Sequence, residues 1–252
     1  MLFNIDGKKV LVTGSTGGLG LVMAEGLARE GAMVILNGRN LQKVKDTVRL
    51  FLVKGYKACG YAFDISNANE VESQMAEIEK DLGTIDVLVN NAGIQHRGAL
   101  EEFKLADWNL VLNTNLTGAF IVTNALIKGM IRNQKGKIIN ICSLQSELAR
   151  PSIAPYATAK GGLKMLTRGM ATEWAKHNIQ VNAIGPGYFK TELTKALWEN
   201  PEFDSWLCNR TPAHRWGNPE ELLGALIFLA SDASSYVNGQ IIYVDGGMTA
   251  CV

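Results

Sequence analysis

The stretch KKVLVTGSTGGLG, residues 8–20, leads from an apolar strand pattern directly into a glycine-rich turn and the start of a helix. Glycines permit a tight turn and let a pyrophosphate approach the backbone. The N-terminus of the following helix offers unpaired N–H groups and a partial positive charge. A glycine-rich turn alone is a weak signal, but a position between a strand and a helix is the context that nucleotide binding requires. We therefore expect a nucleotide site here; turn chemistry without a ligand is the alternative.

Short apolar runs and longer amphipathic runs alternate through the rest of the chain, as they do in βαβ units. Strands that are apolar almost throughout, such as VLVT at 10–13, indicate burial on both faces. The sequence therefore predicts an α/β fold: a single-domain, Rossmann-like, doubly wound parallel sheet of about seven strands over residues 1–252, with helices on both faces. The expected strands are 8–14, 32–38, 57–65, 85–93, 136–143, 178–187 and 240–247, and the longest expected helix covers about 105–132.

The least regular part of the chain is the stretch 185–219, which holds four of the six prolines and three of the five tryptophans. So much aromatic surface beside prolines is unusual for a linker. We expect residues 188–218, called the lid segment below, to leave the sheet and cover a site. A solvent-exposed loop with short helices is the alternative.

Composition limits the classes of function. The 252 residues are 47% apolar and 19% charged, with a net charge of +1, so we expect no electrostatic attraction to nucleic acid or to an anionic membrane. No run of 18 apolar residues and no signal-peptide pattern occurs, and no membrane span is expected. The three histidines show no metal-ligand spacing, so no metal site is expected. Four widely spaced cysteines without a CxxC pair indicate reduced thiols in a cytoplasmic protein: Cys59, Cys142, Cys208 and Cys251.

The end of the second expected strand bears on the choice of nucleotide. An NAD site usually offers a carboxylate there to the ribose hydroxyls, but this chain has Asn37-Gly38-Arg39-Asn40. A guanidinium would pair with a 2′-phosphate, which a carboxylate would repel. The sequence therefore favours NADP as the cofactor, with NAD possible. The alternative is that Arg39 is a solvated charge before a helix.

Seven motifs then follow one another in order: Thr13-Gly14-x-x-x-Gly18-x-Gly20, Asp64, Asn90-Asn91-Ala92-Gly93, Asn115, Ser143, Tyr156-x-x-x-Lys160 and Pro186-Gly187-x-x-x-Thr191. Together they resemble the short-chain dehydrogenase/reductase family over essentially the whole chain. The resemblance implies that Asp64 holds the adenine amino group and that Thr191 and the backbone near Phe189 bind the nicotinamide carboxamide. With Arg39, the expected cofactor-binding residues are Gly14, Ser15, Thr16, Gly18, Leu19, Gly20, Asp64, Ile65, Asn91, Ala92, Gly93, Tyr156, Lys160, Pro186, Gly187, Phe189 and Thr191.

The expected catalytic residues are Asn115, Ser143, Tyr156 and Lys160. Tyr156 and Lys160 are four residues apart and would share one face of a helix. A ketone that receives hydride develops negative charge on oxygen and needs a proton, which Tyr156 would donate while Ser143 hydrogen-bonds the same oxygen. Lys160 would lower the pKa of the phenol by its charge and hold the nicotinamide ribose. Asn115 resembles the family residue that holds a proton-relay water; a helix-bending polar residue bonded to backbone is the compatible alternative.

The expected substrate-binding residues follow the cofactor loops: Gln95, Arg97, Ser143, Gln145, Arg150 and Tyr156, with His96, Glu147 and Tyr188 nearby. A steroid or acyl-chain pocket would be mostly apolar, whereas arginine suits a bidentate grip on a carboxylate. This polar set favours a small sugar acid. The alternative is that Arg97 and Arg150 are solvated, or pair with Glu101, Glu102 or Glu147.

Longer segments, including NNAGIQHRGALEEF and RTPAHRWGNPEEL, resemble the subgroup of the family that interconverts D-gluconate and 5-dehydro-D-gluconate. Relatives that reduce 3-oxoacyl thioesters or other keto sugar acids share most motifs and stay open as alternatives. A nonenzymatic NADP-binding regulator would be expected to lack Ser143, Tyr156 or Lys160, and all three are present. The resemblance also implies a homotetramer, and the apolar ending GQIIYVDGGMTACV could be buried between subunits.

Overall fold

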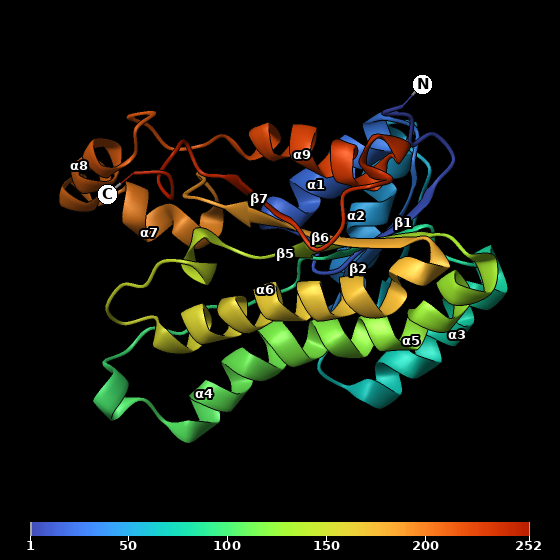
Figure 1. The fold of residues 1–252 in the computed structure, drawn as a ribbon, viewed down its shortest axis with the longest axis horizontal. Helices are drawn as coiled ribbons and strands as arrows, with labels where there is room; N and C mark the ends of the chain where they lie inside the picture. The colour runs from blue at the N-terminus through green and yellow to red at the C-terminus, as the bar shows by residue number, and fades with distance from the viewer. Residues whose placement is uncertain (1, 252) are drawn as a thin grey trace.

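A computed structural model describes residues 2–251, and of Leu193 the backbone only. Seven parallel strands form one sheet in the order β3-β2-β1-β4-β5-β6-β7, which confirms the predicted fold class (Figure 1). The strands are β1 (Lys9–Val12), β2 (Met33–Gly38), β3 (Ala58–Ala62), β4 (Val87–Asn90), β5 (Gly136–Ile141), β6 (Ile179–Pro186) and β7 (Ile241–Val244).

The central strands β4, β5 and β6 are buried on both sides, because helices cover both faces of the sheet. On one face α1 (Gly18–Arg29), α2 (Leu41–Val53) and α9 (Leu223–Ala230) contribute Leu27, Phe51 and Leu226 to the core. On the other face lie α3 (Ala68–Leu82), α5 (Gly118–Asn133) and α6 (Ala154–Trp174), which contribute Ile78, Met130 and Met170. Short 3₁₀ turns, which complete the connections outside the lid segment, are Leu100–Glu102, Leu144–Ser146, Ala175–His177, Pro219–Leu222 and Asp232–Ser234.

The long helix expected at about 105–132 is present but interrupted. It consists of α4 (Leu105–Leu112), one π-helical turn (Asn113–Thr117) and α5. By length and composition alone, Leu105–Asn133 could cross a membrane, with a mean hydropathy of 1.4 in its most apolar window. Of that window 44% is buried, and α5 lies against α3 while α4 lies against α6. An apolar helix that covers a sheet has this same character, so its hydropathy is accounted for by packing.

The lid segment is folded and packed. It contains a 3₁₀ turn (Glu192–Thr194) and the helices α7 (Lys195–Trp198) and α8 (Pro201–Arg210), which lie at the same end of the molecule as the C-terminus (Figure 1). Leu207 and Trp216 of this segment are buried against Leu144 and Met248. The lid segment is therefore fixed to two other parts of the chain, the turn after β5 and the stretch after β7.

The order of the strands decides where a ligand can bind. From β1 the chain runs outward to β2 and β3, and it then returns to β4 on the other side of β1. In a parallel sheet the loops after β1 and β4 therefore leave in opposite directions and open a crevice at the carboxyl ends of the strands. The motifs named above lie at these ends.

Candidate active site

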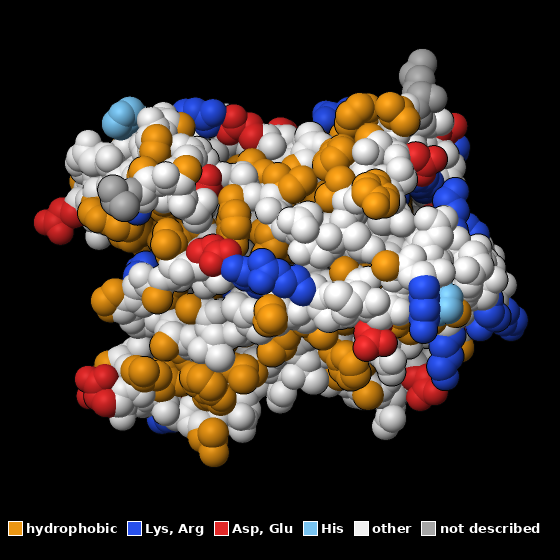
Figure 2. Space-filling view, in the orientation of Figure 1, with side chains coloured by type: hydrophobic (Ala, Val, Ile, Leu, Met, Phe, Trp, Pro, Cys, Tyr) orange, Lys and Arg blue, Asp and Glu red, His pale blue; other side chains and the backbone are white. Residues whose placement is uncertain are grey.

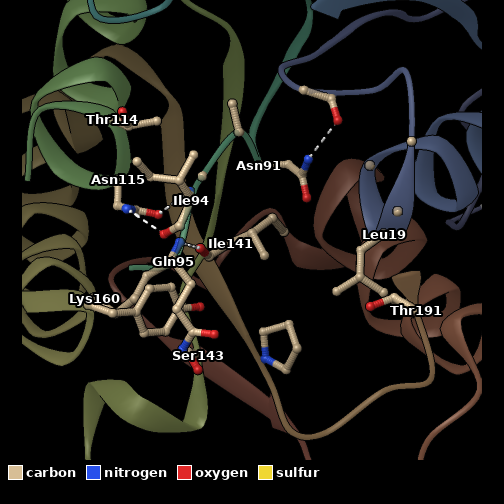
Figure 3. Close-up of a pocket in the computed structure, with 18 of the residues that line it drawn as sticks. Leu19, Asn91, Ile94, Gln95, Thr114, Asn115, Ile141, Ser143, Lys160 and Thr191 are labelled. Carbon is tan, nitrogen blue, oxygen red and sulfur yellow. Dashed lines mark hydrogen bonds between the residues drawn. The ribbon is translucent and has the colours of Figure 1, made fainter. Parts of the chain in front are cut away.

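A cavity of about 450 Å³ opens at the carboxyl edge of the sheet. Its walls come from the ends of β1, β2, β4, β5 and β6, from α6 and from the lid segment. Figure 3 shows Ser143, Lys160 and Gln95 on one side of this cavity, with Leu19 and Thr191 on the opposite side. The residues expected to do chemistry and those expected to hold a cofactor thus face each other.

The turn after β1 is shaped for close approach to a ligand. Gly14 adopts φ +64°, a left-handed conformation, and a Cβ there would come within 2.8 Å of the Ala92 Cα. A Cβ on Gly20 would collide with the Gly14 carbonyl oxygen and the Asn91 side chain. Asn91 Nδ2 also donates to the Thr13 and Gly14 carbonyl oxygens, at 2.9 and 3.2 Å. These contacts leave the cavity side of the turn free, beside the N-terminus of α1, which suits a phosphate.

Asn37 supports the same turn, a role that the sequence analysis missed. Its Oδ1 accepts from Gly14 N at 3.2 Å, and its Nδ2 donates to the Phe63 carbonyl oxygen at 3.2 Å. The side chain therefore ties the turn to β2 and to the chain after β3. Ser15, expected among the cofactor-binding residues, lies outside the cavity lining: its Oγ accepts from Asn37 N at 2.9 Å, and the residue is fully buried.

Arg39 and Asp64 lie together at the outer end of the cavity. Arg39 Nη1 is 3.9 Å from Asp64 Oδ2, and the Arg39 side chain is 72% exposed. The hydrogen bonds from Ser66 and the charge of Arg39 hold the pKa of Asp64 below its usual value, although burial acts in the opposite direction as the largest single effect. Asp64 is thus ionised at neutral pH, and Arg39 retains guanidinium N–H groups that point to solvent or ligand.

Ser143, Tyr156 and Lys160 line the other end of the cavity. Ser143 begins the turn after β5, and its Oγ accepts from Gln145 N at 3.1 Å. Tyr156 and Lys160 come from α6, and Lys160 Nζ lies 5.7 Å from the centroid of the Tyr156 ring. Lys160 Nζ donates to the Ile141 carbonyl oxygen at 2.6 Å. The ammonium is therefore held against the ring face, between α6 and the end of β5.

Burial dominates the titration of both groups. It raises the pKa of the Tyr156 phenol to about 12, and the hydrogen bond with Ser143 opposes this only in part. It lowers the pKa of the Lys160 ammonium to about 8. The pKa of the phenol is thus raised even with the ammonium beside it, because burial is the largest effect and the ammonium donates its hydrogen bond to the Ile141 carbonyl oxygen; that Lys160 favours the phenolate stays a prediction. The phenol is protonated at neutral pH, which is the form that donates a proton.

Asn115 lies inside the π-helical turn and is 1% exposed. Its Oδ1 accepts from Ile94 N at 3.1 Å, and its Nδ2 donates to the carbonyl oxygens of Ile94 and Val111, both at 2.9 Å. The turn therefore directs this amide at the loop after β4, and Figure 3 shows Asn115 beside Ile94. These contacts agree with the alternative considered from the sequence, in which Asn115 is a helix-bending polar residue bonded to backbone.

Gln95, Arg97, Gln145 and Arg150 all line the cavity near Ser143. Gln95 Oε1 accepts from Arg97 Nη2 at 3.0 Å. Burial lowers the pKa of Arg97, and the charge of Arg150, which lines the same cavity, lowers it further. Gln145 Oε1 and Arg150 Nε are buried and have no hydrogen-bond partner within residues 2–251. Unpaired polar groups of this kind indicate a place for a polar ligand.

The acids considered as partners for these arginines lie elsewhere. Glu147 forms an ion pair with Lys164 and accepts from the Tyr243 hydroxyl at 2.9 Å. Within residues 2–251 no ion pair includes Arg97 or Arg150, so pairing with Glu101, Glu102 or Glu147 is excluded there. His96 also lies outside the cavity lining: it contacts Phe103, and its Nε2 is 3.8 Å from Asp107.

Apart from Ser15, every expected site residue lines this one cavity. The lining residues that the site prediction missed are Gly17, Asn37, Gly38, Phe63, Ile94, Thr114, Ile141, Leu144, Ile153, Tyr188, Thr194 and Leu197, of which Tyr188 had been named only as a neighbour. Most of them adjoin a motif residue, and adjacency could have found them. Thr194 and Leu197 belong to the lid segment, which was expected to cover a site, but no motif singled out these two residues within it.

Known proteins are similar to this chain over nearly its whole length. The model of the family described as enoyl-(acyl carrier protein) reductase matches residues 14–249. A gluconate 5-dehydrogenase from Gluconobacter oxydans is 52% identical over 248 residues, which are 98% of this chain and 97% of that protein. A 2-dehydro-3-deoxy-D-gluconate 5-dehydrogenase from Formosa agariphila is 49% identical over 253 residues, covering 100% of this chain and 96% of the relative.

A solved structure gives the same match in three dimensions. The crystal structure of a gluconate 5-dehydrogenase from Burkholderia cenocepacia, in complex with NADP and tartrate, superimposes with a TM-score of 0.98 at 50% sequence identity. The match covers 100% of this chain and 98% of that one.

Proposed function

The chain belongs to the short-chain dehydrogenase/reductase family, and from that premise we propose that it is an NADP(H)-dependent oxidoreductase that interconverts D-gluconate and 5-dehydro-D-gluconate. The observation that carries this proposal is one cavity in which Ser143, Tyr156 and Lys160 adjoin two arginines without acidic partners. Relatives at about half identity act on sugar acids at carbon 5, according to their names.

The cavity fits the dinucleotide. The turn at Gly14 and Gly20 leaves no room for side chains, and the N-terminus of α1 offers N–H groups to a pyrophosphate. Arg39, exposed at the far end, would pair with a 2′-phosphate, which supports NADP over NAD. When bound, NADPH supplies the hydride for ketone reduction.

The chain's own residues supply the rest of the reaction. Tyr156, protonated at neutral pH, donates its hydroxyl proton to the ketone oxygen in reduction and accepts a proton in oxidation. Ser143 hydrogen-bonds the same oxygen and stabilises the charge that develops on it. Lys160 keeps an ammonium beside the phenol ring and favours the charged phenolate once the proton has left.

The acid group of the substrate would be held by Arg97 and Arg150. Two guanidinium groups at a partly buried site repel each other, and a carboxylate between them relieves that repulsion while it receives bidentate hydrogen bonds. Gln145, with its unpaired Oε1, suits a sugar hydroxyl that donates. These groups explain why a polyhydroxy acid fits better than an acyl chain.

A single set of assays tests the proposal. The purified protein is mixed with NADPH and either 5-dehydro-D-gluconate or an acetoacetyl thioester, and separately with NADP⁺ and either D-gluconate or 2-dehydro-3-deoxy-D-gluconate, and NADPH absorbance is followed. We expect the higher kcat/KM with 5-dehydro-D-gluconate in reduction and with D-gluconate in oxidation. A preference for 2-dehydro-3-deoxy-D-gluconate would assign a different sugar acid as the substrate. Turnover of the thioester alone would reject the sugar-acid assignment.

We also propose a homotetramer in the cytoplasm. Hydrophobic side chains gather over α4 and α5 on the face drawn in Figure 2. Leu105 and Leu110 of α4, Phe120 of α5 and Met165 of α6 are exposed. Apolar surface of this kind is typical of subunit contacts. The four cysteines are free, as expected for a chain kept in a reducing compartment.

A further inference from the structure

Arg150 is attached to the lid segment through uncharged groups. Its Cζ lies 5.6 Å from the centroid of the Phe203 ring, which belongs to α8. Tyr188 lines the same cavity, where burial raises the pKa of its phenol and the charge of Arg150 opposes that shift. Arg150 Nε is buried and has no hydrogen-bond partner in the part of the chain that the structure describes. The guanidinium thus lies over an aromatic ring, and its charge is left for a ligand.

The ring beneath Arg150 is itself held by other aromatic rings. Phe203 lies 5.8 Å from Tyr188, 5.2 Å from Trp206 and 6.3 Å from Trp216, measured between ring centroids. Trp216 is 5% exposed, and its Nε1 donates to Asp204 Oδ1 at 2.6 Å. Because these neighbours restrict the ring, the position of Arg150 depends on the fold of the lid segment.

A ring face is a specific support for a guanidinium. The negative face of the aromatic quadrupole attracts the cation, and Arg stacks on it through its flat side. The N–H groups lie in the guanidinium plane and remain free for a bidentate carboxylate. A long side chain that is already held also loses less rotamer freedom on binding than a solvated one.

We propose that Phe203 is a positioning residue: its ring holds the Arg150 guanidinium in the orientation that receives the carboxylate of the ligand, so that the lid segment and the carboxylate stabilise each other. This inference rests on the proposed function only in that the ligand is a small carboxylic acid. A purely structural Phe203, which fills space among Tyr188, Trp206 and Trp216, is the competing explanation.

Binding of tartrate, a small dicarboxylate, tests the inference without turnover. Calorimetric titration of the NADP⁺-saturated enzyme compares wild type with Phe203→Leu, which removes the ring, and Phe203→Tyr, which keeps it. We expect Phe203→Leu to weaken tartrate binding about tenfold, and Phe203→Tyr to stay within about twofold of wild type. Tyr236→Leu is the control, because it removes an aromatic ring that is fully exposed and lies outside the lid segment and the cavity lining, and it should leave tartrate affinity unchanged.

A double-mutant cycle separates positioning from packing. Arg150→Lys keeps the charge but loses the flat surface that stacks on Phe203. If the ring acts through Arg150, Phe203→Leu should cost little further affinity in the Arg150→Lys background. Additive losses, equal losses in Phe203→Leu and Phe203→Tyr, or the absence of saturable tartrate binding by wild type would each overturn the inference. Arg150→Lys and Phe203→Tyr also remain informative if Phe203→Leu does not fold.

Steady-state kinetics distinguish this failure from failure of the proposed function. Phe203→Leu should raise the KM for 5-dehydro-D-gluconate about tenfold, with kcat changed less than about threefold and NADPH affinity unchanged. A wild type that binds tartrate through Phe203 but does not reduce 5-dehydro-D-gluconate would reject the substrate and retain the inference. If the wild type reduces 5-dehydro-D-gluconate, but Phe203→Leu matches the wild type in tartrate affinity and in KM, the proposed substrate is retained and the inference about Phe203 is rejected.

Discussion

At the scale of single residues, the site depends on how one proton is held. The Tyr156 phenol keeps its proton at neutral pH because burial raises its pKa to about 12. Lys160 carries a charge next to the ring, and burial has brought the pKa of that ammonium down to about 8. Burial therefore moves the two pKa values apart, so that near neutral pH the phenol is the group that holds its proton firmly and can deliver it to a substrate oxygen that becomes more basic as hydride arrives.

Replacing Tyr156 by Phe tests its role as the acid. The variant keeps the ring against Lys160 and removes only the hydroxyl, so NADPH binding should be unchanged. We expect kcat to fall by about 10²- to 10⁴-fold, the usual contribution of a general acid. Steady-state assays measure kcat, and fluorescence titration measures the affinity for NADPH. Activity within about tenfold of wild type would remove Tyr156 from the mechanism.

The pH dependence should differ between the two directions. Oxidation of D-gluconate needs the deprotonated phenol, so kcat/KM should rise with pH over the neutral and mildly alkaline range; reduction needs the protonated form and should not rise. Lys160→Met removes the neighbouring cation and should displace the oxidative profile to higher pH. Lys164→Met, one turn further along α6 and outside the cavity, is the control. Identical profiles for wild type and Lys160→Met would contradict this assignment.

Arg39 decides cofactor choice if it meets the 2′-phosphate. Arg39→Asp should weaken NADPH binding by about tenfold to a hundredfold and change NADH binding much less, since only NADPH carries that phosphate. Arg49→Asp is a control with the same change in net charge, on the exposed side of α2 and away from the cavity. Equal losses for both cofactors with Arg39→Asp would show that Arg39 makes no phosphate contact.

At the scale of secondary structure, the π-helical turn between α4 and α5 places an amide where a regular helix would not. π-Helical turns are rare in proteins as a whole, but those that occur are often found at functional sites. Here the turn brings Asn115 to both backbone groups of Ile94, in the loop that carries Gln95 and Arg97 into the cavity. The distortion of this helix thus fixes the loop that faces the substrate side.

Asn115→Ala should separate the loop from the helix. It leaves the partly buried Ile94 N–H and carbonyl oxygen without their side-chain partner, and the cost of a fully buried unpaired group, about 1–3 kcal/mol, is the upper bound for each. We expect a loss of about 2 kcal/mol or more in the free energy of unfolding, measured with denaturant, and a lower kcat. Asn113→Ala, exposed in the same turn, should change stability by less than about 0.5 kcal/mol. Similar losses in both variants would point to helix propensity instead.

The elements themselves were predictable because local patterns decide them. Apolar runs of four to eight residues became strands, and the glycine turn at 14–20 lies where its context indicated. The π-helical turn was not predictable, because the sequence 105–132 reads as one continuous helix. Nor was the approach of Phe203 to Arg150, since 53 positions separate them and only the packing of the lid segment brings them together.

Charges were the least predictable part of the site. The position of Lys160 beside Tyr156 follows from helical spacing, but the hydrogen bond to Ile141 and the desolvation of both groups depend on the surrounding fold. For the same reason the sequence could not decide whether the arginines had acidic partners. Glu147, the nearest in sequence to Arg150, is taken by Lys164.

At the scale of the whole molecule, exposed apolar side chains on α4 and α5 bear on assembly. Phe120 is 49% exposed on α5, and Leu110 is 49% exposed on α4. Phe120→Glu places a charge within that surface and should convert the proposed tetramer to smaller species, as measured by light scattering after gel filtration. Leu50→Glu, on α2 at the opposite face of the sheet, should remain tetrameric. A monomeric wild type, or a tetrameric Phe120→Glu, would contradict the proposed use of this surface.

The packing of Met248 against Leu207 and Trp216 has a practical consequence. The stretch after β7 contacts the lid segment through Met248. Asp245 stabilises the turn in this stretch by accepting hydrogen bonds from Gly247 N and Thr249 N. Exposed Ala250 follows this anchored turn and lines no part of the cavity. A fluorophore or ¹⁹F tag attached there would lie next to the lid segment without obstructing either ligand, so its signal would show whether the binding of a sugar acid changes the packing of that segment.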